Sequence, residues 1–248
     1  MRRFWLAVGT LFERELVRFW REKTRVVGFV GSPLIFWLVI GSGFGDLGFF
    51  FPGALTLTVM FSAIFSTMSI IEDRREGFLL SMLVSPAPRS SMVLGKILGS
   101  STLAWIQALM LLVFVPLAGL EVTPLSLLAL AGVLFLIAFA FTGLGFLVAW
   151  KMNSAQAFHG IINLLLMPLW MVSGALFGLG SAHGWMRWLM RANPLTYPTM
   201  ALKRLLSSEV EAGTPSMGVC LAVTVAWAVA WWIASTLVAR RKASGSAA

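Results

Sequence analysis

The stretch EDRREGFLLSMLVSPAPR, residues 72–89, separates two long hydrophobic runs and indicates how the chain is organised. It opens with five charged residues and continues with seven residues that are apolar except for Ser81. Ser85-Pro86-Ala87-Pro88 then breaks the chain. Seven helical residues extend only about 10 Å, whereas a bilayer core is roughly 30 Å thick. The stretch therefore predicts a short apolar segment outside the membrane that the flanking runs imply.

The composition is that of an integral membrane protein. Of the 248 residues, 58% are hydrophobic and 12% are charged, and the mean hydropathy is +0.87. The apolar runs are continuous rather than alternating, which excludes β-barrel strands and predicts an all-α fold. The single cysteine lies inside a hydrophobic run, so neither a disulfide framework nor a thiolate metal site is expected.

Six apolar runs are long enough to cross a bilayer, which takes about 20 helical residues. We place them near 26–45, 52–71, 97–119, 124–149, 157–180 and 216–239. These spans leave an N-terminal segment, 1–25, a loop, 72–96, and a long segment before the last span, 181–215. The sequence thus predicts a single transmembrane domain, 1–248.

The basic residues orient this domain. Fifteen Lys and Arg residues fall in the N-terminal segment, the 72–96 loop, the 150–156 loop and the C-terminal tail, and four fall on the other side. Cytoplasmic loops carry the excess of Lys and Arg, so both termini are expected in the cytoplasm. We expect the protein in the plasma (inner) membrane. The charges also suit contact with anionic membrane lipids. A nucleic-acid partner is not expected, because the charges are spread over several loops.

The N-terminal segment has two opposed stripes when it is plotted as a helix. One stripe is apolar and the other is basic, which predicts a helix lying in the membrane interface. Such a helix could anchor the first span, or it could transmit motion. The apolar stripe is Trp5, Val8, Phe12, Leu16 and Phe19, and the basic stripe is Arg14, Arg18, Arg21 and Arg25.

The short segment Phe78 to Val84 is too apolar to remain exposed to water without a reason. The headgroup boundary, the ends of the bundle or another protein could cover it. Gly77 permits a tight turn at its start, while Pro86 and Pro88 prevent the helix from running on into the next span. We therefore expect a rigid knob on the cytoplasmic face.

The longer stretch EDRREGFLLSMLVSPAPRSSMVLGKIL resembles the loop between the second and third spans of type-2 ABC transporter permeases. In that family a charged cluster and a glycine precede a short coupling helix, which Ser/Thr-Pro, Arg and Gly-Lys follow. The matching positions are Arg75, Glu76, Gly77, Leu80, Leu83, Ser85, Pro86, Arg89, Gly95 and Lys96. WMRWLMRANPLTYPTMALKRLL, 185–206, is similar to the family's outer region of two short helices, so the resemblance covers nearly the whole chain.

The resemblance implies that the knob contacts a separate ABC ATPase subunit. The residues it assigns to that contact are Arg75, Glu76, Gly77, Phe78, Leu80, Leu83, Pro86 and Arg89. ATP and Mg²⁺ would be bound by that partner, since this sequence lacks the G-x-x-x-x-G-K-[ST] phosphate-binding motif. The resemblance further implies a homodimer, or a heterodimer with a related permease, that exports a hydrophobic drug or a lipid-linked glycan.

The predicted spans contain no Asp, Glu, Lys or Arg in their interiors, which argues against a proton-driven carrier and a charge-lined ion pore. The most polar positions are Gln107, His159 and Asn163, which could form helix-packing hydrogen bonds or contact a substrate. In the outer segment, Trp185 and Trp188 share a helical face as headgroup anchors or as an outer gate, and Asn193-Pro194 breaks the helix.

Two other classes of function stay open at this point. A passive channel or a structural membrane scaffold would need no ATPase partner. An intramembrane enzyme would need catalytic groups, but no nucleophile–base spacing, metal-ligand cluster or cofactor motif is visible in the sequence.

Overall fold

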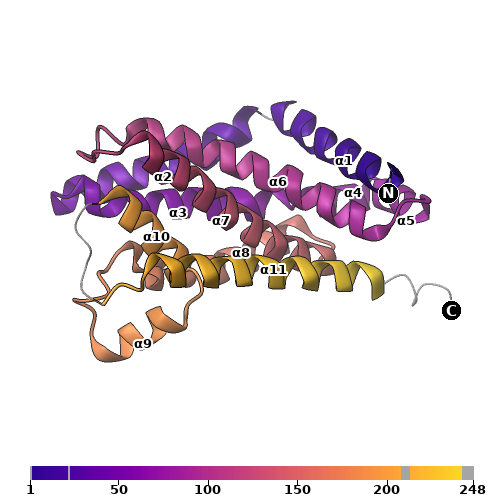
Figure 1. Ribbon diagram of the computed structural model, residues 1–248. Coiled ribbons are helices and arrows are strands. Elements are labelled where there is room, and N and C mark those ends of the chain that lie inside the picture. Colours follow the sequence, from indigo (N-terminus) through magenta and orange to yellow (C-terminus); the bar gives the residue numbers. More distant parts are fainter. Residues whose placement is uncertain (1, 22, 208–212, 242–248) are drawn as a thin grey trace.

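The computed structural model describes residues 2–21, 23–207 and 213–241, and all regular structure in these ranges is helical (Figure 1). The predicted all-α class is therefore confirmed. The long helices are α1 (Arg2–Arg21), α2 (Lys23–Phe44), α3 (Leu47–Ser66), α6 (Arg89–Leu111), α7 (Pro124–Lys151), α8 (Ala155–Trp170) and α11 (Met217–Arg241). The shorter segments are α4 (Ser69–Arg75), α5 (Phe78–Val84), η1 (Leu112–Phe114), η2 (Met171–Ala175), α9 (Gly184–Ala192) and α10 (Thr196–Leu206).

Among the described residues, five helical stretches are long and apolar enough to cross a membrane. They correspond to the second to sixth predicted spans. They are Leu47–Arg75, Arg89–Phe114, Pro124–Lys151, Ala155–Ala175 and Met217–Arg240. The first predicted span, 26–45, falls on α2, whose described part contributes a shorter apolar helix, Gly31–Phe44. The chain is thus a multi-pass membrane protein, and the sixth crossing stays a prediction.

The stretch formed by α3 and α4 lies at the centre of the bundle. In the most apolar part of this stretch, 89% of the length is buried inside the bundle. In the corresponding part of α11 only 17% is buried, so α11 presents most of its surface outward. A two-residue turn joins α2 to α3: Gly45 has a φ of 73°, and the Asp46 carboxylate accepts a hydrogen bond from the Phe49 amide at 2.8 Å. This turn places α2 antiparallel against the central helix, where the Trp37 indole donates to the Leu47 carbonyl at 2.8 Å.

Most of the predicted 72–96 loop is helical. The central stretch continues through the charged residues to Arg75, because their side chains find partners on other helices. Pro88 then occupies the N-cap of α6, so this helix begins at Arg89, well before the predicted start at 97. Only two short connections flank α5.

The fifth and third spans end earlier than predicted. At the end of α8 the helix widens into the π-helical turn η2, where Gly174 has a φ of 86°. The helical stretch ends at Ala175 instead of continuing to 180. A Cβ at Gly174 would lie 2.0 Å from the Met200 side chain, so this position favours glycine. The third span ends at Phe114 and not at 119.

The two ends of the bundle differ in what they carry (Figure 1). The start of α1, helices α4 and α5 and the end of α11 gather at one end, while α9 and α10 lie toward the other. The 181–215 segment forms these last two helices, as the sequence predicts. The polar features that follow are divided between the same two ends.

Candidate functional site

Helix α5 is a short helix fixed at both of its ends. Gly77 precedes it with a φ of 77°, a conformation that glycine adopts without the steric cost of a side chain. Ser85 follows in an extended conformation, and Pro88 starts the next helix. The seven residues of α5 are the seven that the sequence predicts as a short segment.

Two faces of α5 differ in exposure. Leu79 is buried, and Phe78, Met82 and Leu83 are partly buried against the bundle. Leu80 and Val84, four residues apart and therefore on one face, are 67% and 76% exposed. Leu83, which the resemblance assigns to the ATPase contact, is partly buried against the bundle. The sequence reading missed Val84, which the i, i+4 spacing from Leu80 could have identified.

The other residues predicted beside α5 lie on its two connections or bind neighbouring helices. Glu76 and Pro86 are exposed, and Glu76 Oε1 lies 3.9 Å from Arg18 Nη2. Arg75 donates to the Asn153 carbonyl at 3.2 Å, and Arg89 donates to the Arg240 carbonyl at 3.2 Å. Both arginines therefore tie the surroundings of α5 to neighbouring helices.

Arg74 anchors α4 to the end of α7. Its guanidinium donates to the Trp150 carbonyl at 2.6 Å, to Asn153 Oδ1 at 3.0 Å and to the Met152 carbonyl. Carbonyls at a helix C-terminus lack intrahelical hydrogen-bond donors, so Arg74 supplies hydrogen bonds that these carbonyls would otherwise lack. The helix leading into α5 is thereby held from the α7 side.

Behind α5 lies an ionic cluster, which we define as Arg14, Glu15, Arg18, Glu72, Asp73 and Lys96. Arg14 Nη2 lies 2.7 Å from Asp73 Oδ1, Arg18 Nη2 lies 2.6 Å from Glu72 Oε2, and Lys96 Nζ lies 2.7 Å from Glu15 Oε1. Glu15, Asp73 and Lys96 are buried. Buried charges are tolerated only when they are paired and hydrogen-bonded, as here. The sequence reading placed Asp73 and Lys96 in a loop and so missed the cluster.

The contacts of Arg14 stabilise its charged form. Burial disfavours its charged form, but the hydrogen bond to Asp73 and the nearby carboxylates outweigh burial and raise its pKa. Its Cζ atom lies 3.7 Å from the centre of the Phe78 ring. Arg14 therefore links the cluster to the first residue of α5 through a cation–π contact.

The packing of α1 differs from that of a helix lying only on lipid. Its buried face includes Val8, Leu11 and Glu15, which lie against two glycines of α6. A Cβ at Gly95 would lie 2.9 Å from the Val8 carbonyl oxygen, and one at Gly99 would lie 2.8 Å from the Glu15 Cβ. The glycines thus allow α1 to approach α6 closely.

Both predicted stripes of α1 include residues that contact the rest of the bundle. Of the apolar stripe, Val8 and Phe19 are buried and Trp5 is 62% exposed. Of the basic stripe, Arg14 and Arg18 bind acidic partners, while the side chains of Arg21 and Arg25 lie outside those that the structure describes.

The predicted substrate-path residues lie on two helices, Gln107 on α6 and His159 and Asn163 on α8. Gln107 is buried and accepts a hydrogen bond from Ser62 at 2.9 Å, which supports the helix-packing interpretation for this residue. The His159 ring lies 4.6 Å from the ring of Phe65, and Asn163 is exposed on α8.

The predicted outer-gate residues separate in a similar way. Trp185 and Trp188 are 65% and 69% exposed on α9. Asn193 is instead buried in the turn between α9 and α10, with Pro194 beside it. Its Nδ2 donates to the Leu169 carbonyl at 2.6 Å and its Oδ1 accepts from the Leu195 amide at 2.9 Å, so this side chain fixes the turn against the end of α8.

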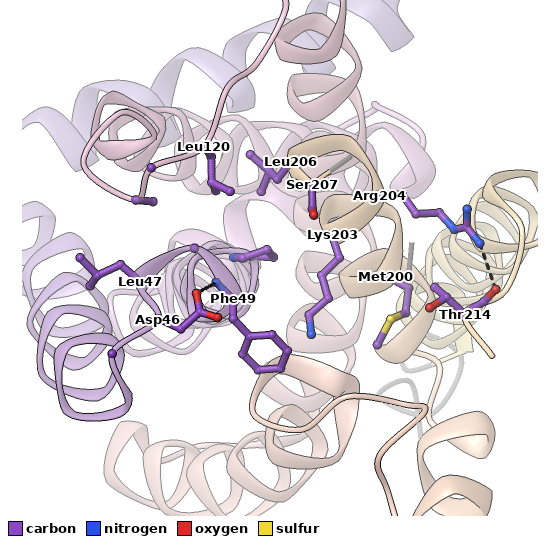
Figure 2. A pocket seen from close by; sticks show the side chains of 15 residues that line it. Asp46, Leu47, Phe49, Leu120, Met200, Lys203, Arg204, Leu206, Ser207 and Thr214 are labelled. Atoms are coloured by element: carbon purple, nitrogen blue, oxygen red, sulfur yellow. Dashed lines mark hydrogen bonds between the residues drawn. The ribbon is translucent and has the colours of Figure 1, made fainter. Parts of the chain in front are cut away.

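A pocket of about 640 Å³ lies at the end opposite α5, between the α2–α3 turn, the η1–α7 connection and α10 (Figure 2). Lys203 Nζ lies 3.9 Å from the centre of the Phe49 ring. Arg204 points toward the wall, where it donates to the Thr214 carbonyl at 3.0 Å. None of the predicted path or gate residues is among the lining residues. Within the described part of the chain, no group of three or more His, Cys, Asp or Glu side chains is placed to hold a metal ion.

These features define the class of protein: a multi-pass, all-α membrane protein with a firmly anchored apolar helix at one end of its bundle. Residues 7–206 match the family model described as ABC-2 type transporter. The chain therefore belongs to the ABC-2 type transporter family, which confirms the resemblance noted from the sequence. Members of this family are transport permeases, and the chain is accordingly assigned a transport role rather than a catalytic one.

Two relatives agree with the family. Over 211 residues, the chain is 27% identical to the transport permease ycf38 of Cyanophora paradoxa, an alignment that covers 79% of this chain and 73% of the relative. Over 228 residues, it is 25% identical to the daunorubicin resistance ABC transporter permease protein DrrB1 of Streptomyces coeruleorubidus, covering 85% and 78% respectively.

Proposed function

We propose that this chain is the membrane subunit of an ATP-driven exporter and that α5 is the docking helix for a separate ABC ATPase subunit. The observation that carries the proposal is the apolar pair Leu80 and Val84, exposed on a helix that is otherwise anchored. An apolar pair of this kind on a rigid support is typical of a contact with a partner protein. Glu76, before α5, and Pro86, after it, are both exposed and would form the rim of that contact.

The anchoring of α5 supports a mechanical role. A docking element transmits motion only if it moves with the bundle instead of bending at its ends. Arg74 joins the preceding helix to the end of α7, and Arg14 lies over Phe78. In our proposal, ATP-driven movement of the ATPase shifts α5, and the helices follow between two conformations that bind the cargo differently. ATP and Mg²⁺ would be bound by the ATPase and not by this chain.

The cargo we propose is a hydrophobic drug-like molecule or a lipid-linked glycan, moved out of the cytoplasm. Support for a drug-like cargo comes from the relative whose name assigns it to daunorubicin resistance. The apolar surfaces of the spans suit molecules that partition into the bilayer.

We further propose that two permease chains assemble in the plasma membrane, either as a homodimer or with a related permease. The outward face of α8 supports this. Ile161, Leu164 and Leu165 are all exposed on it, and only 33% of the most apolar part of this helical stretch is buried. The distribution of fifteen basic residues against four supports cytoplasmic termini and a cytoplasmic α5.

Co-purification tests the assignment. The full chain, tagged at its C-terminus through a flexible linker, is extracted from its own host in mild detergent, and the proteins that accompany it are identified. We expect a stoichiometric protein with a phosphate-binding P-loop. If the chain purifies alone under conditions that keep other ABC complexes intact, the exporter proposal fails and a passive channel or scaffold becomes the better interpretation.

A further inference from the structure

Asp73, on α4, joins α1 and α6 through its carboxylate. Its buried carboxylate accepts hydrogen bonds from Arg14 at 2.7 and 3.2 Å and from Arg18 at 3.2 Å, and Lys96 Nζ also contacts it. The two arginines come from α1, one helical turn apart, and the lysine comes from α6. One carboxylate, at the end of the central helical stretch, therefore holds α1 and α6 together.

The contacts of Asp73 extend to α5 through Arg14. The guanidinium that binds Asp73 also lies 3.7 Å from the centre of the Phe78 ring. Phe78 directly follows Gly77, which has no side chain with which to fix the turn. Arg14 thus holds the first residue of α5, while Leu79, Met82 and Leu83 pack against the bundle.

We propose that Asp73 is a positioning residue that holds Arg14 over Phe78, so that α1 and α5 move as one rigid element. Arg14, in the second half of α1, reaches both Asp73 on α4 and Phe78 on α5, as this requires. The consequence for transport rests on the proposed docking of an ATPase, whereas the geometric part concerns this chain alone. Helix α1 would then be part of the moving element and not only a membrane anchor.

A distance measurement on the purified full chain tests the geometric part. Spin labels are placed at Leu6→Cys on α1 and Ser81→Cys on α5, two exposed positions, while the single native cysteine, Cys220, is buried. We expect one narrow distance distribution in the parent protein in nanodiscs. Asp73→Asn should broaden it clearly, because the neutral amide cannot hold both arginines and Lys96. An unchanged distribution in a folded Asp73→Asn protein would overturn the proposal.

A second variant covers the case in which Asp73→Asn does not fold. Arg14→Met removes the contact with Phe78 but leaves Arg18 and Lys96 on Asp73, and the Arg14 side chain is partly exposed. It should broaden the same distribution, whereas the matched control Arg3→Met, an exposed residue of the same helix, should not. Equal behaviour of the two variants would refute the role assigned to Arg14 and Asp73.

The functional part is measured with ATP as the probe. In a reconstituted complex, Asp73→Asn should still bind the ATPase. The extent to which the permease stimulates ATP hydrolysis should fall by about fivefold or more, which is a typical coupling between sites. Unchanged stimulation at equal amounts of bound ATPase would overturn the positioning role. If no ATPase binds even the parent chain, the proposed function fails instead, while the distance result still decides the geometric part.

Discussion

Replacing Leu80 and Val84 together by aspartate is the sharpest test of the docking face on α5. These side chains are 67% and 76% exposed, so a partner that covers them removes most of their surface from water. Full burial of one such side chain contributes roughly 1.5–3 kcal/mol, so covering the exposed part of both is worth roughly 2–4 kcal/mol. This corresponds to about a 30- to 1000-fold change in the Kd for the ATPase. Burying two carboxylates adds a further penalty, which makes this range a lower bound.

The assay is binding of the purified ATPase partner to the permease in nanodiscs, measured by biolayer interferometry. The control variant combines Leu80→Met with Val84→Ile, which keeps both positions apolar and should change the Kd by only about threefold or less. Leu83→Asp supplies the contrast: on the inward face of α5 it should lower thermal stability. If the double aspartate variant bound the ATPase within threefold of the parent, the docking assignment would be refuted.

Three further substitutions test the local structure, each by thermal unfolding in detergent. Gly77→Val should destabilise the protein by about 1–2 kcal/mol, because its φ of 77° is costly for a residue with a side chain. Gly99→Leu should cost roughly 1–3 kcal/mol by forcing α1 away from α6, whereas Gly132→Leu, with open space around its Cβ, should cost little; equal effects would contradict the close packing. Asn193→Ala removes two hydrogen bonds of a buried turn and should cost about 1–3 kcal/mol, while Asn163→Ala at an exposed position should be nearly neutral.

The features that the sequence predicts correctly are those set by local patterns. Five of the six apolar runs correspond to helices long enough to cross a membrane, because the length of a run determines whether a helix can do so. The bounds of α5 are predicted because Gly77 and the prolines after it act on the backbone directly. The end of the fifth span is not predicted, because the apolar run continues past Gly174, where the backbone takes a φ of 86° and the helical stretch ends at Ala175.

The partners of the charged residues are the part that the sequence does not reveal. A helical-wheel plot shows that Arg14 and Arg18 share a face of α1, but it does not show which carboxylates they meet. Their partner Asp73 lies more than fifty positions away along the chain. One local signal was available: Gly95 and Gly99 lie one turn apart on α6, a spacing that allows another helix to approach closely.

The ionic cluster places ionisable side chains in two of the long helical stretches. Asp73 and Lys96 lie inside the helical stretches Leu47–Arg75 and Arg89–Phe114, just outside the spans 52–71 and 97–119 that the sequence predicts to be free of charged residues. Buried ionisable residues in such helices often mark ion pathways. Here, however, both Asp73 oxygens already accept hydrogen bonds from arginines, and Lys96 binds Glu15 as well as Asp73. These charged side chains pair with one another near one end of the bundle. They therefore favour a structural link between α1, α4 and α6 over a relay for protons or ions.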